Sequence, residues 1–478
     1  MTHESIPGIG SILQVNSADI GGGAERISWN LHCAYRRLGY RSRLAVGCRR
    51  SEDPDVCVIG GPAAPNLWTK GWLAIDRHLS PLVGKIRGAG RVQRMVRLLA
   101  VPKRLGRVLQ GHEDFYSPGT WRLLEVGGDH PEILHCHNLH GNYFDLEALP
   151  WLSQQLPVVV TLHDAWLLSG HCAHSFECER WRTGCGNCPD IKIYPPIVRD
   201  ATAYNWERKA QIYKRSRLYI ATPSHWLMRS VEQSMLSKAI VEKRVIPNGI
   251  DLSIFRPEFR PDDRKAARAA VEIPEGVRMV LFMGGSRMRR PWKDRETIDA
   301  AIRLVAKRAH DQQVWFVGIG ETAPSVSIGN VTIVFRRYLD TLELLARYYQ
   351  AADIYVHAAH VDTFPNMVIE ALACGTPVVA TDVGGIQEQI KPLIPGQEMV
   401  SEQRSSAAHV DATGILVPPR DPLKLANAIL FLLENDAVRM RLGENAAADA
   451  KCRFDEKRMV ESYLDWYKNI CAARSGHA

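Results

Sequence analysis

The segment from residue 362 to residue 388 combines acidic side chains with a predicted helix start. Asp362 precedes Pro365 and Asn366, which favour the first turn of a helix, and Glu370 follows about one turn into that helix. The helix comes directly after an apolar run, Ile354–His357, that is typical of a buried strand. The backbone amides of such a helix start stabilise an anion such as pyrophosphate, and Glu370 is placed to reach a ribose hydroxyl.

Glycine-containing loops follow predicted strands at two other places. The loop 382–385 contains two glycines and is followed by Glu388, and the loop 21–23 consists of three glycines before a helix from Glu25 to Leu38. Because glycine has no side chain, its backbone can approach a phosphate closely. For the loop 21–23, an ordinary turn between a strand and a helix is the alternative interpretation.

Four of the eleven cysteines fall close together in the sequence. They are Cys172, Cys178, Cys185 and Cys188, with His171 and His174 beside them. The glycine within the final Cys-x-x-Cys lets both thiolates point at one tetrahedral Zn²⁺, which predicts a structural zinc. Four thiolates leave no open position, so this zinc would not be catalytic. Free thiols and an iron–sulfur or redox role are the alternatives.

The net charge of +8 is concentrated in residues 69–110. This basic segment contains one acidic residue, Asp76, and ten basic ones, which leaves a net charge of −1 for the rest of the chain. Apolar residues alternate with the cations, so the segment is expected to form a basic amphipathic helix that contacts an anionic membrane surface. A solvated basic helix is the alternative; nucleic acid is not expected, since no binding motif accompanies the charge.

The overall composition bounds the class of protein. With 478 residues, 46% hydrophobic and 23% charged, the chain has the composition of a globular protein of two or three domains. The chain contains no run of about 18 apolar residues, so no transmembrane helix is expected. The first ten residues lack the pattern of a signal peptide. An odd number of cysteines in a long chain fits a cytosolic enzyme better than a disulfide scaffold.

Short apolar strands alternate with helical periodicity in both halves of the chain. This pattern predicts an α/β protein with two doubly wound domains. The expected boundaries are residues 1–243 for an N-terminal domain, 244–261 for a linker and 262–454 for a C-terminal domain. The amphipathic helix 455–478 is expected to pack back on the N-terminal domain.

Taken together, these motifs resemble a known family. An acidic residue, seven further residues and a glutamate, followed by Ala-Leu-Ala-Cys-Gly-Thr-Pro-Val-Val-Ala-Thr and Gly-Gly, is similar to the signature of retaining glycosyltransferases of family 4, which have the GT-B fold. The motifs at 21–25, 163–166, 223–227 and 246–251 agree in order. Within the family, the chain looks most like the exopolysaccharide and colanic acid transferases. The resemblance implies two Rossmann-like domains that face each other across a cleft.

The resemblance also implies roles for single residues. His163 would face the transferred sugar, Glu370 would bind the ribose of a nucleotide-sugar, and Lys293 with Arg287 would neutralise the diphosphate. Arg289 or Arg290 could replace Arg287 in that pair. Asp362 stands where the family has a glutamate that contacts the donor sugar, and it is one methylene shorter. The family's glycine after the lysine is Asp294 in this chain.

The predicted site therefore comprises two sets of residues. The catalytic set is His163, Lys293 and Asp362. The donor-binding set is Gly22, Gly23, Arg287, Lys293, Phe364, Pro365, Asn366, Met367, Glu370 and Glu388.

The expected activity is transfer of a sugar, with retention of its anomeric configuration, from a nucleotide-sugar to a lipid-linked or polysaccharide acceptor. No cofactor is required for that chemistry. The expected location is the cytoplasm, peripheral on the inner face of the plasma membrane. The alternatives are a GT-B sugar-nucleotide epimerase and a non-catalytic protein that binds nucleotide-sugars.

Overall fold

The computed structural model describes residues 10–475 with several internal gaps. The gaps are 60–66, 80–81, 83–85, 87, 100–101, 114–116, 127, 129, 259, 285–291, 310–311, 340 and 394–410. The chain divides into two compact units. The first contains Met1–Thr222, Met228–Arg244 and Leu464–Ala478, and the second contains Pro223–Leu227 and Val245–Tyr463.

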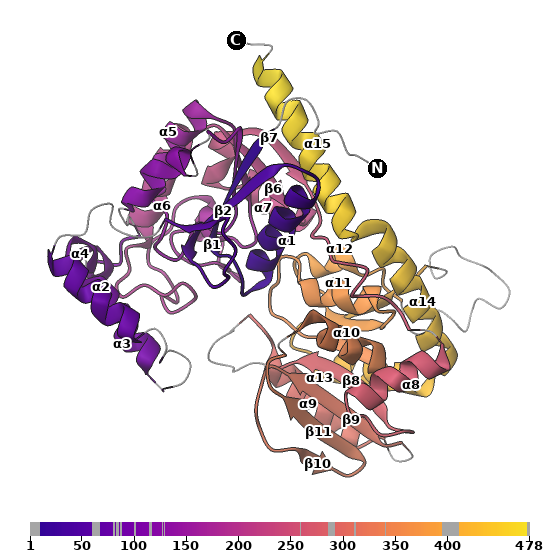
Figure 1. Cartoon of the computed structure of the whole chain (residues 1–478). Coiled ribbons are helices and arrows are strands. Elements are labelled where there is room, and N and C mark those ends of the chain that lie inside the picture. Colours follow the sequence, from indigo (N-terminus) through magenta and orange to yellow (C-terminus); the bar gives the residue numbers. More distant parts are fainter. Residues whose placement is uncertain are drawn as a thin grey trace. The chain divides into compact units, whose positions relative to one another are not determined.

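The first unit is built on a seven-stranded sheet in the order β3-β2-β1-β4-β5-β6-β7 (Figure 1). The neighbours from β3 to β6 pair in parallel. The strands are β1 (Ser11–Ala18), β2 (Arg41–Cys48), β3 (Val56–Val58), β4 (Ile133–Cys136), β5 (Val158–Thr161), β6 (Leu218–Thr222) and β7 (Ile240–Val245). The helices are α1 (Gly23–Arg37), α2 (Leu67–Leu79), α3 (Ala89–Leu99), α4 (Pro102–Leu109), α5 (Ala148–Gln155) and α6 (Thr202–Lys214). Helix α7 (His225–Glu232) begins in the second unit and belongs to the first from Met228 onward. Helices α2, α3 and α4 lie to one side of this sheet (Figure 1).

The second unit contains a sheet in the order β10-β11-β9-β8-β12-β13-β14. Its strands pair in parallel except for β10, which is antiparallel to β11. The strands are β8 (Arg278–Met283), β9 (Val314–Ile319), β10 (Val326–Ile328), β11 (Val331–Arg336), β12 (Ile354–His357), β13 (Val378–Thr381) and β14 (Gly414–Val417). The helices are α8 (Pro261–Ala270), α9 (Arg295–Ala306), α10 (Leu342–Ala351), α11 (Asn366–Ala373), α12 (Ile386–Gln389), α13 (Pro422–Glu434), α14 (Asp436–Arg453) and α15 (Glu456–Ser475).

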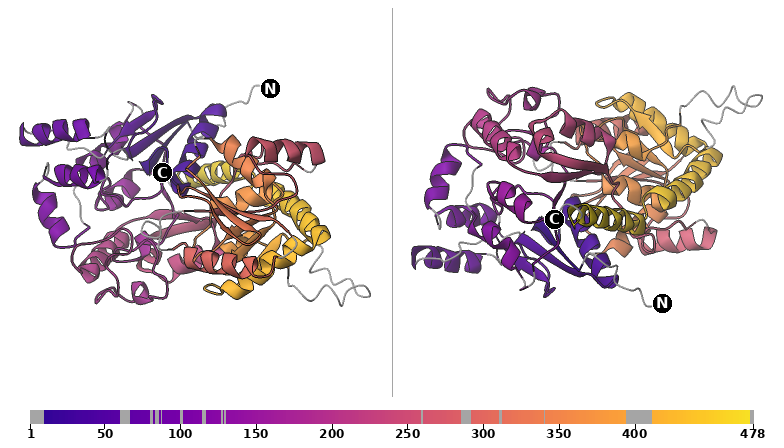
Figure 2. Two further views of the ribbon diagram at one scale, coloured as in Figure 1. Left: turned by 90° about the horizontal axis from the view of Figure 1, so that it is seen from below. Right: turned by 90° about the horizontal axis from the view of Figure 1, so that it is seen from above.

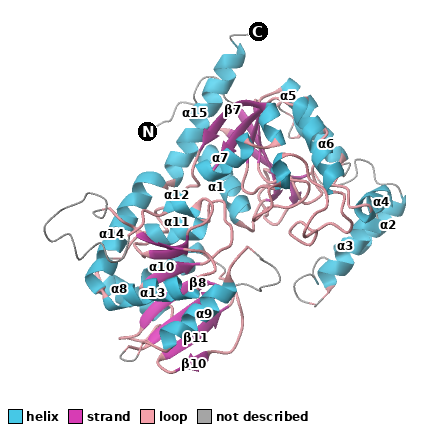
Figure 3. Ribbon diagram, turned by 180° about the vertical axis from the view of Figure 1, so that it is seen from behind, coloured by secondary structure: helices cyan, strands magenta, loops and turns pink. Residues whose placement is uncertain are grey.

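Both faces of the second sheet are buried, which explains why its strands are continuous apolar runs. Met279 and Leu281 of β8 belong to one core cluster with α8, α10, α11 and α14. Val280 and Phe282 belong to the other cluster with α9 and α13. The helices on both sides of the strands can be followed in Figures 2 and 3. Two mostly parallel sheets covered by helices confirm the predicted α/β class.

The boundaries between the units differ from the predicted ones in two places. Residues 244–261 were predicted as a linker, but Ile250 and Phe255 are buried in the core of the second unit, where Ile250 also bridges to Asp455. The last helix, α15, changes units at Leu464 rather than belonging to the first unit along its whole length. Beyond that point, Tyr467 Oη and His135 Nδ1 lie 2.7 Å apart and are hydrogen-bonded.

No helix within the described ranges combines the length and the apolarity that crossing a bilayer requires.

Candidate active site

Helix α11 begins where the sequence predicted, directly after β12 and a short loop. Pro365 is its N-cap residue, with extended backbone, and Asn366 is the first helical residue. Asn366 Oδ1 accepts a hydrogen bond from Asn248 Nδ2 at 2.9 Å. Phe364 is buried and packs edge-on against Phe454, while Met367 packs against the core. Phe364 and Met367 therefore support the helix start from the apolar side.

Glu370 lies one turn into α11 and its side chain is fully buried. Tyr349 Oη donates a hydrogen bond of 3.1 Å to Glu370 Oε2. A buried polar group without a hydrogen-bond partner is costly, so the tyrosine hydroxyl stabilises the Glu370 side chain in the core. The sequence did not identify Tyr349, whose position in α10 becomes relevant only once α10 packs on α11.

Lys293 and Asp362 are brought together by a short pairing of two loops. Lys293 forms an antiparallel bridge with Ala359, and the backbone N–H groups of Asp294 and His360 bond across the same pair of segments. Lys293 Nζ then donates to Asp362 Oδ2 at 2.7 Å. Burial raises the pKa of Asp362, but the positive charge of Lys293 outweighs burial and holds that pKa well below its ordinary value. Asp362 is therefore a carboxylate at neutral pH.

A histidine that the sequence did not single out completes this group. His357, the last residue of β12, has its Nε2 atom 2.9 Å from Lys293 Nζ and 3.4 Å from Asp362 Oδ2. Its Nδ1 atom lies 3.0 Å from Tyr355 Oη. Burial, followed by the charge of Lys293, lowers the pKa of His357 to about 4. A polar residue at the carboxyl end of an apolar parallel strand is the signal that would have identified it.

Asp294, which stands where the family has a glycine, begins the next helix. Its Oδ1 atom accepts from the N–H of Thr297 at 3.0 Å, and its Oδ2 atom accepts from Thr297 Oγ1 at 2.6 Å. The aspartate is thus the N-cap of α9, a role in which aspartate is strongly favoured. The predicted basic partners Arg287, Arg289 and Arg290 lie outside the described residues.

The Gly-Gly loop packs on the backbone beside Asp362. Gly384 has φ +56°, and a Cβ atom there would lie 2.0 Å from the carbonyl oxygen of Asp362. A Cβ atom on Gly385 would lie 1.8 Å from the carbonyl oxygen of Thr363. The N–H of Gly385 also donates to Asp362 O at 3.0 Å. Only glycine fits this close approach, and the loop fixes the position of the Asp362 backbone.

Glu388 is engaged with the start of α7. Its two carboxylate oxygens accept from the backbone N–H groups of His225 and Trp226 at 2.7 and 2.6 Å. Ser224 Oγ donates to Thr363 O at 3.0 Å beside this contact. Because a carboxylate at a helix N-terminus satisfies orphan amides, the structure gives Glu388 a capping role. Its predicted contact with the donor stays a prediction.

The first unit holds the remaining predicted residues. His163 follows β5, and its Nε2 atom lies 3.0 Å from Nδ1 of His137, which follows β4. The side-chain amide of Gln14 lies 3.1 Å from the other ring nitrogen of His137. Burial lowers the pKa of His163 to about 4, so this ring is neutral at pH 7. No sequence motif identified His137, although it lies at the same sheet edge.

Two further features of the first unit bear on the predicted site. Asp164 accepts from His140 Nε2 at 2.9 Å and from the N–H of Trp166. Gly22 is the N-cap residue of α1 and Gly23 its first residue, directly after β1. A Cβ atom on Gly22 would lie 2.7 Å from Glu25 Oε2.

The cysteine segment lies in a long irregular region between β5 and α6. His171 Nε2 lies 3.4 Å from Cys188 Sγ, and the N–H of Gly170 donates to Cys185 Sγ. Burial raises the pKa of the Cys172, Cys185 and Cys188 thiols. Among the residues that the structure describes, no three histidine, cysteine or acidic side chains are grouped closely enough to hold a metal ion. Structural zinc stays a prediction.

Comparisons with known proteins agree with the fold and the motifs. A family model described as Glycosyltransferase Family 4 matches residues 21–254, and one described as Glycosyl transferases group 1 matches residues 277–435. An Escherichia coli (strain K12) protein, named for colanic acid biosynthesis as the glycosyl transferase WcaC, is 24% identical over 71% of this chain and 77% of its own length.

One further relative and one solved structure match different shares of this chain. The D-inositol 3-phosphate glycosyltransferase of Geodermatophilus obscurus is 32% identical, over 47% of this chain. The chain spans about half the length of that relative, 46%. Anabaena HepE, solved in complex with UDP and glucose, has a TM-score of 0.57 and 16% identity, and the match covers 95% of this chain and 98% of HepE. This likeness shows the fold.

The two Rossmann-like units have the GT-B fold, and the two family models, which together match residues 21–254 and 277–435, identify the class as glycosyltransferase. The chain belongs to the glycosyltransferases of family 4, in the group 1 class.

Proposed function

We propose that this glycosyltransferase transfers a sugar from a nucleotide-sugar donor, with retention, to a lipid-linked or polysaccharide acceptor. The observation that carries the proposal is the grouping of Lys293, Asp362 and His357 at the carboxyl end of β12, just before α11, the helix that contains Glu370. A cation there stabilises the negative charge that develops on a leaving diphosphate. The similarity to WcaC, which is named for colanic acid biosynthesis, supports the acceptor class, and the similarity to HepE, solved with UDP and glucose, supports the donor class.

The chemistry assigned to these residues is a front-face displacement. The bond from the anomeric carbon to the donor phosphate breaks, and the bond to the acceptor hydroxyl oxygen forms on the same face. The hydroxyl proton passes to the leaving phosphate. In this proposal Lys293 contacts the diphosphate, Asp362 contacts the donor sugar, Glu370 contacts the ribose and His163 faces the transferred sugar.

The first test is a screen of the purified protein with UDP, GDP and ADP by thermal shift and calorimetry. A ligand at about 100 times its dissociation constant stabilises the folded state by roughly 2.7 kcal/mol, which such a screen detects. The selected donor is then incubated with a polyprenyl-linked sugar, and the product's anomeric configuration is read by NMR. The Glu370→Ala variant should bind the nucleotide more weakly and lose transfer while keeping its secondary structure.

The alternative activities give different results in the same assay. An epimerase releases free nucleoside diphosphate and an altered sugar without any acceptor. A non-catalytic binding protein binds the nucleotide but leaves the donor intact on prolonged incubation. Either result, obtained with protein that binds the nucleotide, would replace the transferase proposal.

We also propose that the basic segment 69–110 contacts an anionic membrane surface. Helices α2, α3 and α4 cover much of it, and it exposes large apolar side chains among its cations. Trp68 (just before the segment), Ile75, Ile86, Val92, Met95 and Leu109 are between 45% and 58% exposed. Apolar side chains enter the lipid interface while basic residues contribute about 1 kcal/mol each near an anionic surface. Arg91 is exposed, whereas the side chains of Arg94 and Arg97 lie outside the described residues.

Co-sedimentation with liposomes tests this surface. We expect binding to anionic liposomes, loss of binding in high salt and little binding to neutral liposomes. Replacing Arg91, Arg94 and Arg97 with glutamine should weaken binding and leave nucleotide affinity unchanged. The matched control replaces Arg122, Arg182 and Arg215, which are exposed and ion-paired elsewhere in the first unit. Equal loss in the control, or no binding at low salt, would count against the proposal.

The zinc prediction is tested by metal analysis of protein purified without chelators. One zinc per chain is expected, and it should be lost in Cys185→Ser and Cys188→Ser but kept in Cys48→Ser and Cys452→Ser, whose thiols are exposed elsewhere. Substoichiometric zinc in the wild type, with four thiols that react freely, would favour the free-thiol alternative.

A further inference from the structure

His357 is held between a lysine and a tyrosine in the interior of the second unit. His357 is the last residue of β12 and is 3% exposed. One ring nitrogen faces Lys293 Nζ at 2.9 Å, and the other faces Tyr355 Oη at 3.0 Å. Tyr355 is itself fully buried, and its ring lies edge-on to that of Tyr349. The imidazole therefore has a fixed position at the rigid end of a strand.

The hydrogen bonds determine which nitrogen of His357 carries the proton. An ammonium group only donates, so Nε2 must accept from Lys293. A neutral imidazole that accepts at Nε2 carries its proton on Nδ1, and Nδ1–H then donates to Tyr355 Oη. Burial keeps the ring neutral at pH 7, since it lowers the pKa of His357 to about 4. The ring is thus a permanent acceptor for Lys293.

The charge on Lys293 is only partly satisfied by these contacts. Across the described residues, Lys293 donates to Asp362 Oδ2 and His357 Nε2, which engages two of the three ammonium protons. Its side chain is 20% exposed and that of Asp362 is 15% exposed. One N–H therefore remains for a phosphate oxygen, and its direction is fixed by the other two.

A lysine side chain has four rotatable bonds and would swing about a single ion pair. Asp362 is also one methylene shorter than the glutamate of the family, so it reaches less far to hold the cation. A second acceptor on the sheet removes this freedom. We infer that His357 is a positioning residue, which holds the ammonium group of Lys293 in the orientation that contacts the donor diphosphate. This inference rests on the proposed function, in which Lys293 contacts that diphosphate.

The test compares a nucleoside diphosphate with the matching monophosphate, using the UDP and UMP pair or the pair that the nucleotide screen selects. His357→Leu removes the acceptor at similar size, and His357→Gln restores one, because its amide oxygen lies about where Nε2 was. We expect His357→Leu to weaken UDP binding about tenfold, since a hydrogen bond to a charged group is lost. UMP affinity should stay within about twofold. His357→Gln should remain within about threefold of the wild type for both nucleotides.

His360→Leu is the control, because His360 is three residues away and its ring faces Asp294 instead. It should leave the affinity for UDP unchanged. If His357→Leu binds UDP as tightly as the wild type, the inference is wrong. Equal losses in His357→Gln and His357→Leu would show that the ring only fills space. A wild type that binds no nucleoside diphosphate overturns the proposed function, and the inference with it.

A second measurement does not depend on the folding of any His357 variant. In ¹⁵N NMR spectra of the wild type at pH 7, His357 should show a protonated Nδ1 and an unprotonated Nε2. In Lys293→Met the Nε2 resonance should move, because its donor is gone, while the other buried histidines stay in place. A protonated Nε2 in the wild type would overturn the inference.

Discussion

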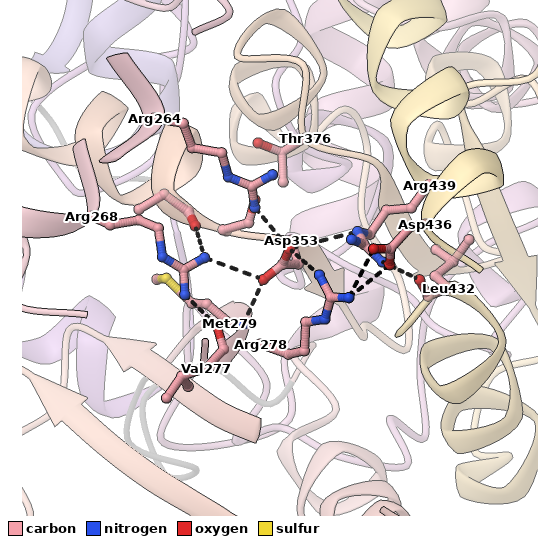
Figure 4. A network of polar contacts seen from close by, with 12 residues as sticks. Arg264, Arg268, Val277, Arg278, Met279, Asp353, Thr376, Leu432, Asp436 and Arg439 are labelled. Atoms are coloured by element: carbon pink, nitrogen blue, oxygen red, sulfur yellow. Dashed lines mark hydrogen bonds and ion pairs between the residues drawn. The ribbon is translucent and has the colours of Figure 1, made fainter. Parts of the chain in front are cut away.

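The two ends of strand β12 carry opposite kinds of charged clusters. Asp353, just before the strand, is 2% exposed and is surrounded by Arg264, Arg268, Arg278 and Arg439 (Figure 4). The backbone N–H of Met279 also donates to its Oδ2 atom at 2.8 Å. At the other end, the described contacts of the Asp362 carboxylate are with one cation, Lys293, and one neutral ring, His357.

The difference lies in what each cluster leaves unsatisfied. Around Asp353, donors exceed the acceptors, and Asp436 takes part of the excess by pairing with Arg278 and Arg439. Such a network is a structural contact that joins α8, β8 and α14. Around Asp362, the contacts of the described residues leave one ammonium proton of Lys293 without an acceptor, in a partly exposed position. Asp353, at the amino end of the strand, is surrounded by arginines that are paired within the core, which is typical of a structural carboxylate. Asp362, at the carboxyl end, pairs with a lysine that keeps one N–H for a ligand.

The largest expected effect comes from removing the structural carboxylate. Asp353→Ala should lower the free energy of unfolding by about 3 kcal/mol or more, because several guanidinium groups lose their central partner. Asp436→Ala is the matched control, since the Asp436 side chain is 56% exposed, and it should cost less than about 1 kcal/mol. Urea titrations measure both. Equal effects would remove the distinction between the buried and the exposed carboxylate.

Removing the cation at the carboxyl end of β12 should affect activity rather than stability. Lys293→Ala is expected to reduce transfer about a hundredfold to a thousandfold, as other losses of a group that stabilises developing charge do. Its unfolding curve should stay close to that of the wild type. Lys307→Ala, which removes an exposed lysine at the end of α9, should transfer at the normal rate. Wild-type turnover by Lys293→Ala would exclude this lysine from the site.

Acid should destabilise the protein through its buried neutral histidines. Burial lowers the pKa of His135 to about 3 and that of His163 and His357 to about 4. The unfolded chain binds these protons near pH 6.5, so stability is full above pH 6.5 and falls as the pH drops toward 4. Each histidine contributes roughly 3 kcal/mol to that loss. The pKa of Asp362 is lowered too, but its contribution is lost only below about pH 3.8.

Urea unfolding at pH 7.0, 5.5 and 4.5 measures this dependence. His357→Gln should show a smaller loss of stability across the range than the wild type, because one of the buried histidines is gone. An unchanged slope would show that His357 does not stay neutral in the folded state.

The smallest expected effect comes from removing the tyrosine hydroxyl that contacts Glu370. Tyr349→Phe removes the hydrogen bond to Glu370 Oε2 and should cost about 1–2 kcal/mol of stability, because that carboxylate is fully buried. Nucleotide affinity should fall only a few-fold if Glu370 keeps its position. Tyr338→Phe, at a 69% exposed site, is the control and should change neither quantity. Thermal unfolding and calorimetry give both values.

Much of the second unit could be read from local patterns. The strand Ile354–His357 and the start of α11 at Asn366 lie where the sequence predicted them, because apolar runs and helix caps act over a few residues. The role of Glu388 could not be read in this way. Its partners, the amides of His225 and Trp226, are more than 160 positions away in the chain.

The sequence alone therefore determined the class of the fold, the family and the identity of Lys293, Asp362 and Glu370 as candidates. Only the tertiary structure decided that His357 joins them, since Lys293 lies 64 positions before His357 and 69 before Asp362. Those residues meet because β8 pairs with β12 in a parallel sheet whose carboxyl ends share one edge. Strand order depends on packing between distant segments, and no local pattern of side chains specifies it.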